Sequence, residues 1–83
     1  MLEFKYDTQL LIDGENLSED RINEYITANF EGDSLLVVGF DTMIKIHFHT
    51  NHPWQLLEYA STIGDIYDIV VENMERQANG LQG

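Results

Sequence analysis

The sequence predicts an α+β domain of the βαββαβ kind, a ferredoxin-like sandwich with a four-stranded antiparallel sheet and two helices on one face. Two patterns support this prediction. Segments 2–12 and 43–49 alternate apolar and polar residues with a period of two, and the apolar run 34–38 is too short for a typical helix. Apolar residues at helical spacing follow positions 18 and 53, and residues 66–71 supply a fourth strand.

Local signals delimit the first helix. We expect Ser18 to be its N-cap, because acidic residues fill the following turn and Leu17 is placed to pack on Ile22. The full capping box is absent, since its last position holds Arg21. Gly32 is a suitable stop for this helix.

The second half of the chain predicts a β-hairpin and then a second helix. Residues 39–42 (Gly-Phe-Asp-Thr) turn the chain between strands 34–38 and 43–49. Pro53 falls in the first turn of the second helix and Gly64 ends it. Residues after Arg76 show no periodicity, so we expect one domain over residues 1–77 and a frayed tail at 78–83.

Composition limits the possible partners. The chain has 83 residues, enough for one domain, and carries fifteen acidic residues against four basic ones, a net charge of −11. That charge disfavours nucleic acid and anionic membranes. The absence of cysteine excludes disulfides and thiol nucleophiles, and the N-terminus lacks the pattern of a signal peptide. We therefore expect a cytoplasmic protein.

The segment 45–49 (Lys-Ile-His-Phe-His) carries the candidate site. In the usual strand order of this fold, 4-1-3-2, the first and third strands are central antiparallel neighbours. Residues two apart on a strand point to the same face about 6–7 Å apart, so His47 and His49 can reach one ion. Asp7 of the first strand shares their uncovered face. Two histidines and a carboxylate, with a position left for water, have the composition expected of a catalytic or exchangeable zinc, iron or manganese site.

These residues also have simpler interpretations, which stay open. Two histidines two positions apart occur by chance in many sheets, and the nearby Lys45 opposes a cation. His52 is a further candidate ligand, although a loop contact is commoner at such a position. The sequence has neither a nucleotide-phosphate loop nor a nucleophile elbow, so we assign no catalytic or cofactor-binding residue.

An apolar group adds to the open face near the turn: Leu36, Val38, Phe40 and Met43. A patch of this kind on a small sheet usually marks packing against another protomer or domain. We predict a homodimer through the open sheet face, and favour it over a lipid pocket.

Several stretches between Tyr6 and Gln77 carry a resemblance to a known family. They are 6–9 (Tyr-Asp-Thr-Gln), 14–17 (Gly-Glu-Asn-Leu), 32–39 (Gly-Asp-Ser-Leu-Leu-Val-Val-Gly), 44–50 (Ile-Lys-Ile-His-Phe-His-Thr) with Pro53, 64–65 (Gly-Asp) and 71–74 (Val-Glu-Asn-Met). The His-x-His-Thr stretch and the closing Glu-Asn-Met are the most specific. On these residues the sequence resembles the middle domain of the bacterial fatty-acid kinase catalytic subunit, whose N-terminal part is a dihydroxyacetone-kinase-like (DAK2) helical domain.

The resemblance implies a dimerisation role and, as in some members, a zinc ion held by two histidines and a cysteine on the first strand. It implies His47 and His49 as ligands and places Asp7 where the cysteine would stand. Carboxylate for thiolate keeps a negative ligand but weakens a soft, structural zinc site. The implied partners are a kinase domain and an acyl-binding protein. Kinase chemistry belongs to the helical domain, so we expect no enzyme activity from this domain by itself.

Three hypotheses follow. The leading one is a non-catalytic interaction and dimerisation domain that holds a metal. The alternative is a stand-alone small-molecule-binding regulatory domain of the ferredoxin-like type. A small acylphosphatase-like enzyme comes third, because that chemistry needs an Arg and a phosphate-cradling loop near the first strand, and residues 12–16 (Ile-Asp-Gly-Glu-Asn) are acidic instead.

Overall fold

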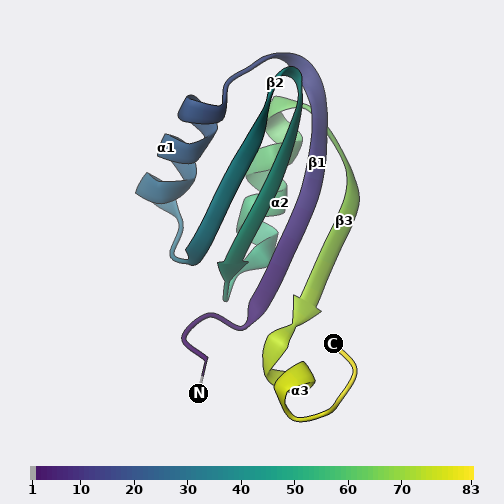
Figure 1. The fold of residues 1–83 in the computed structure, drawn as a ribbon. Helices are drawn as coiled ribbons and strands as arrows, with labels where there is room; N and C mark the ends of the chain where they lie inside the picture. Colours follow the sequence, from purple (N-terminus) through teal and green to yellow (C-terminus); the bar gives the residue numbers. More distant parts are fainter. Residues whose placement is uncertain (1) are drawn as a thin grey trace.

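The computed structural model describes residues 2–83 and contains three strands and three helices. The elements are β1 (Tyr6–Leu17), α1 (Glu19–Asn29), β2 (Asp33–Thr50), α2 (Pro53–Ile63), β3 (Asp65–Asn73) and α3 (Met74–Ala78). The strands form one antiparallel sheet in the order β2-β1-β3 (Figure 1). The predicted α+β class is confirmed. Among the described residues, no helix has the length and apolar character needed to span a membrane.

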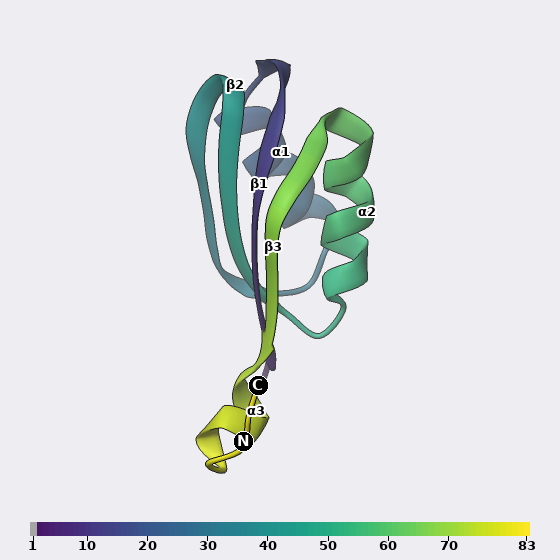
Figure 2. The same cartoon turned by 90° about the vertical axis from the view of Figure 1, so that its right-hand side faces the viewer.

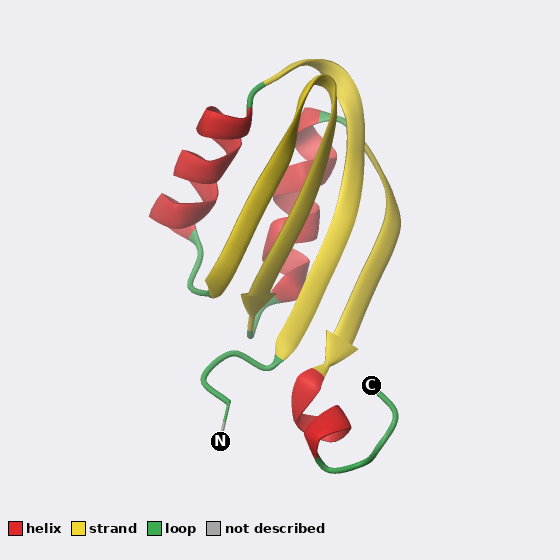
Figure 3. Ribbon diagram, viewed as in Figure 1, coloured by secondary structure: helices red, strands yellow, loops and turns green. Residues whose placement is uncertain are grey.

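Strand β2 differs most from the sequence prediction. It stays extended over 18 residues yet folds back on itself, so that its two limbs lie side by side (Figures 1 and 3). Gly39 and Asp41 at the bend have positive φ angles of 141° and 56°. The strand element is continuous through this bend, so the two predicted strands form one element over Asp33–Thr50. Four separate strands and the ferredoxin-like topology are therefore not confirmed.

The predicted pairing of the first strand with segment 43–49 is confirmed. Asp7 lies opposite His49 and Gln9 lies opposite His47 in the β1–β2 ladder. Strand β3 pairs with the other side of β1, which makes β1 the central strand. The segment that carries the histidines thus pairs along its length with the central strand β1.

Both long helices cover the same face of the sheet (Figure 2). The core between them contains Leu10, Ile12, Leu17, Ile22, Ile26, Val37, Ile44, Ile46, Phe48, Leu56 and Ala60. Because successive strand residues point to opposite faces, burying 44, 46 and 48 directs 45, 47 and 49 to the open face. The core therefore fixes which way the histidines point.

The ends of the long helices agree with most of the predicted signals. Ser18 Oγ accepts a hydrogen bond from the Arg21 N–H at 3.3 Å, and Gly64 is the C-cap of α2. The C-cap of α1 is Phe30, so Gly32 does not end the helix. A side chain at position 32 would collide with the Phe48 ring. A glycine is therefore needed here so that the backbone at residue 32 can lie close to the second limb of β2.

Helix α3 was not expected from the sequence. Asn73 caps it by accepting a hydrogen bond from the Arg76 N–H at 3.0 Å, and the Arg76 side chain donates to the Gln82 carbonyl oxygen at 3.0 Å. The division into a domain at 1–77 and a frayed tail at 78–83 stays a prediction.

Replacing Gly39 with Ala should destabilise the domain, because the bend of β2 has no room for a side chain. The φ angle alone should cost about 1–3 kcal/mol in the free energy of unfolding, and the new Cβ would also collide with the Met43 carbonyl oxygen. Urea unfolding followed by circular dichroism measures the loss. Gly80→Ala is the control, since Gly80 also has positive φ but nothing within 4 Å of its Cβ direction. Equal losses in both variants would refute the steric argument.

Candidate metal centre

The structure brings the three predicted ligands together on the open face. Asp7 comes from β1, and His47 and His49 come from the second limb of β2. One potential ligand atom from each residue lies within 4.8 Å of the others. The predicted ligand set is therefore compatible with a single ion.

The two histidines aim the same ring nitrogen at the carboxylate. Asp7 Oδ1 lies 2.9 Å from His47 Nε2 and 3.8 Å from His49 Nε2. The imidazole rings meet edge to face, with centroids 4.8 Å apart. All three side chains are 21–26% exposed, so the cluster is half-buried and still accessible from solvent.

One oxygen of this cluster accepts no hydrogen bond. Asp7 Oδ1 is shielded from solvent, and His47 Nε2 lies 2.9 Å away, which is an ion-pair distance when the ring is protonated. A buried, unsatisfied carboxylate oxygen is costly, and such atoms are rare in folded proteins. A cation between this oxygen and the two Nε2 lone pairs would satisfy all three atoms. The donor set therefore fits a divalent ion.

Two further residues considered in the sequence lie outside the cluster. His52 is the N-cap residue of α2 and packs edge to face against Trp54, with ring centroids 5.2 Å apart. Lys45 lies opposite Leu11, four pairs along the ladder from Asp7. The structure thus assigns neither residue to the candidate metal site.

The predicted apolar group is exposed. Leu36, Val38, Phe40 and Met43 are between 44% and 85% exposed, and Phe40 is the most exposed of them. They lie on both limbs of β2 near its bend. We call this group the hairpin patch.

Sequence reasoning missed two residues beside the histidines. The Ser34 carbonyl oxygen lies 3.2 Å from His47 Nδ1, and Asp33 Oδ1 lies 3.5 Å from His49 Nδ1. Both residues belong to the first limb of β2. The signal for them was the hairpin itself, because a turn at 39–42 places residue 34 beside residue 47.

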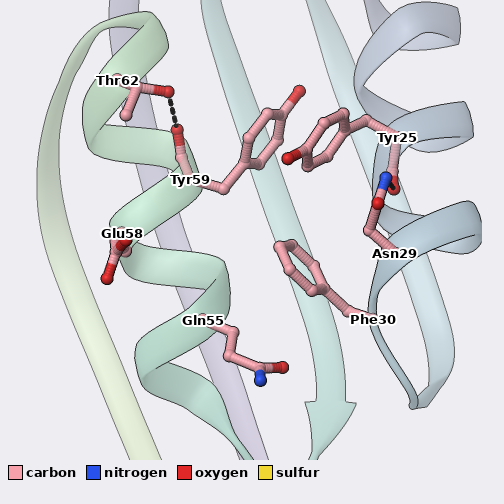
Figure 4. A pocket seen from close by; sticks show the side chains of 7 residues that line it. All are labelled: Tyr25, Asn29, Phe30, Gln55, Glu58, Tyr59 and Thr62. Atoms are coloured by element: carbon pink, nitrogen blue, oxygen red, sulfur yellow. Dashed lines mark hydrogen bonds between the residues drawn. The ribbon is translucent and has the colours of Figure 1, made fainter.

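A cluster of aromatic rings joins α1 to α2 on the covered side (Figure 4). Tyr25 and Tyr59 stack with centroids 4.0 Å apart, and Phe30 packs edge to face against both rings. The nearby polar side chains of Asn29 and Thr62 donate hydrogen bonds to the helix backbones. We therefore interpret the cluster as the contact between the helices. Burial and the neighbouring Tyr25 together raise the pKa of Tyr59 above 10.0.

Comparison with known families establishes the kinship of the chain. A family model for the middle domain of FakA-like proteins, which resemble one subunit of fatty acid kinase, matches residues 3–81. The chain belongs to this family. The resemblance carried by the His-x-His-Thr stretch is confirmed.

Individual relatives are longer proteins. The chain is 44% identical over 46 residues to an uncharacterised protein of Staphylococcus epidermidis, which is 55% of this chain and 8% of that protein. It is 41% identical over 50 residues to the protein YloV of Bacillus subtilis, which is 60% of this chain and 9% of that protein. The matched segments span less than a tenth of the curated relatives.

Replacing Tyr59 with Phe should remove part of the loss of stability at alkaline pH. The raised pKa means that the unfolded chain releases the Tyr59 proton before the folded domain does. The contribution of the neutral Tyr59 side chain to the free energy of unfolding is therefore fully present below the unfolded pKa of about 10, and it is lost as the pH rises through the higher folded pKa. Urea unfolding at pH 8, 10 and 11 measures this slope. An identical alkaline loss in Tyr59→Phe would contradict the assignment.

Proposed function

We propose that this domain is a non-catalytic interaction domain of a fatty-acid-kinase-type protein, which pairs protomers through its open sheet face and holds a divalent ion there. The observation that carries the metal proposal is the unsatisfied, buried Asp7 Oδ1 beside two histidine Nε2 atoms. Membership in the middle-domain family supports the kinase context. The proposed location is the cytoplasm, and the proposed further partners are a kinase domain and an acyl-binding protein.

The ligand chemistry supports zinc or another first-row ion. Neutral imidazole suits zinc, iron and copper, while a carboxylate adds one negative charge and a hard oxygen. Asp7 stands where the resemblance implies a cysteine, and a thiolate would bind zinc more strongly than this carboxylate does. We therefore propose a weaker, more exchangeable site than a closed structural zinc centre. Three protein ligands leave a coordination position for water or for a partner's group.

The role of the ion would be structural. It would link β1 to the second limb of β2 by side chains, in addition to the backbone ladder between them. It would also neutralise charge in a chain whose net charge is −11. Both effects stabilise the sheet whose open face is the proposed interface.

The hairpin patch supports pairing of protomers through the sheet face. Its four apolar side chains are exposed on the open side, and a small domain gains most from covering such a surface. Both long helices lie on one face of the sheet (Figure 2), so the opposite face is available to a second copy. We propose that the two copies bury their hairpin patches against each other.

The free edge of β3 is a poorer interface. The β1–β3 register shifts between Gln9 and Leu11, where β3 has an extra residue and Asp68 has a positive φ of 49°. A bulge and acidic side chains on an edge strand oppose pairing with another strand. This favours pairing through the face over pairing through this edge.

Removing a ligand should abolish specific zinc binding. We expect the wild-type domain to bind one Zn²⁺ per chain, and Asp7→Ala and the double variant His47→Ala, His49→Ala to lose at least the ~10–100-fold in affinity that even an outer-shell partner provides. Titration against a zinc chelator measures the dissociation constants. Asp7→Cys should bind Zn²⁺ more tightly than wild type, since it adds a thiolate.

His52→Ala is the matched control for the zinc experiment. It removes the third histidine of the chain, which lies outside the cluster, and should leave the affinity unchanged. If Asp7→Ala and the double variant His47→Ala, His49→Ala bind zinc as tightly as wild type does, the metal site is refuted.

Charging the hairpin patch should break the dimer. We expect wild type to be a dimer by light scattering at tens of micromolar, and Phe40→Asp to raise the dimer dissociation constant about 30-fold or more, a loss typical of an interface hot spot. The dimer should strengthen with salt, because two chains of charge −11 repel each other. Trp54→Asp is the control, since Trp54 is exposed on α2 in the other layer. A wild type that is monomeric in both low-salt and high-salt buffer would refute the proposal.

A further inference from the structure

We propose that Asp33 and Ser34, on the first limb of β2, are positioning residues that hold the two histidines with Nε2 aimed at the ion. This inference rests on the proposed metal site and assigns a role to the Gly-Asp-Ser stretch at 32–34. Neither residue would contact the ion. Each would bind the far nitrogen of one imidazole ring.

His47 has the closer contact at its far nitrogen. Its Nδ1 lies 3.2 Å from the Ser34 carbonyl oxygen, while its Nε2 lies 2.9 Å from Asp7 Oδ1. A carbonyl oxygen can only accept, so this hydrogen bond requires the proton on Nδ1. In the neutral ring the Nε2 lone pair is then free and points into the cluster.

His49 repeats the arrangement with a carboxylate. Its Nδ1 lies 3.5 Å from Asp33 Oδ1, at the outer limit of a hydrogen bond, and its Nε2 faces Asp7 at 3.8 Å. The Asp33 side chain is 59% exposed, so its carboxylate can turn toward the ring without loss of packing. Histidine ligands commonly donate their second N–H to a carboxylate or a backbone carbonyl, and here a group of each kind lies near the far nitrogen of one histidine.

The backbone at residues 32–34 is held in an uncommon conformation next to the two histidines. Ser34 has a φ of 55°, a left-handed conformation that is uncommon for a residue other than Gly, Asn or Asp. Gly32 is packed against the Phe48 ring and the His49 carbonyl oxygen, so that no side chain fits there. Thr50 Oγ1 donates a hydrogen bond to the Glu31 carbonyl oxygen at 2.9 Å and holds the start of the limb. Strained backbone that is fixed on both sides is typical of functional positions.

The chemical consequence is preorganisation. A free imidazole can rotate about its two side-chain torsions and can present either nitrogen to an ion. Fixing Nδ1 selects one tautomer and one ring orientation, and it raises the basicity of the ligand nitrogen. The carbonyl contact of His47 is the closer of the two, and the exposed Asp33 carboxylate would act on His49 only where it turns toward the ring.

The test compares Asp33→Ala with Asp33→Asn in the 83-residue chain, with Zn²⁺ as the probe. Asp33→Ala should weaken zinc binding about 10–100-fold. Asp33→Asn should recover part of that loss, because its amide oxygen still accepts a hydrogen bond from Nδ1. Asp20→Asn, which removes one exposed charge from α1, should leave the affinity unchanged.

Proton NMR of the zinc-loaded protein supplies a readout that a general loss of stability would not give. The Nδ1–H protons of both histidines should be visible in wild type. In Asp33→Ala the His49 signal should exchange with water and disappear, while the His47 signal should persist, since its acceptor is the Ser34 backbone.

The outcomes separate the two proposals. If wild type binds zinc through Asp7 and the histidines but Asp33→Ala binds it equally well and keeps both Nδ1–H signals, the positioning role alone is refuted. If wild type binds no zinc, the metal site is refuted and the positioning role with it. Loss of affinity in Asp33→Ala with partial recovery in Asp33→Asn supports both.

Discussion

The register between β1 and the second limb of β2 is the constraint on which the rest of the structure depends. Asp7 pairs with His49, and the same ladder sets Leu10 against Ile46 in the core. Because side chains alternate between faces, a slip of one residue would bury the histidines and expose the isoleucines. Core formation and assembly of the ligand set are therefore one event, and the hydrophobic core provides the energy that holds the polar cluster together.

Much of this could be predicted from the sequence, for a physical reason. Alternation in a half-buried strand states directly which residues face the core, so the open-face position of His47 and His49 followed from Ile44, Ile46 and Phe48. Their meeting with Asp7 required only that the first strand lie beside theirs. The number of strands was less accessible, because nothing in residues 39–42 shows that the two limbs form one continuous strand element through the turn. The role of Gly32 was also missed: a glycine after a helix suggests a stop, and only the tertiary contact with Phe48 reveals the alternative.

The parts that could not be predicted depend on contacts between distant segments. Helix α3 is too short to show a periodic pattern, and its cap is a single side chain, Asn73. The stacking of Tyr25 on Tyr59 needs the relative placement of two helices that the sequence does not encode locally. Asp33 and Ser34 belong to the same class, since their nearness to the histidines comes from the bend of β2 and not from spacing along one strand.

The net negative charge of the chain affects both parts of the proposed function, metal binding and the pairing of protomers. A domain with fifteen acidic residues and four basic ones opposes its own dimerisation, and Asp7 adds a negative charge on the same open face, six pairs along the ladder from Met43 of the hairpin patch. A divalent cation bound at the proposed site would offset part of that charge on the face that a second copy would cover. Metal binding and pairing through the open face would then favour each other by mutual linkage, because each is easier once the other has occurred. On this proposal the carboxylate of Asp7 would make the site weaker than one with a thiolate ligand, so its occupancy would vary more readily with metal concentration.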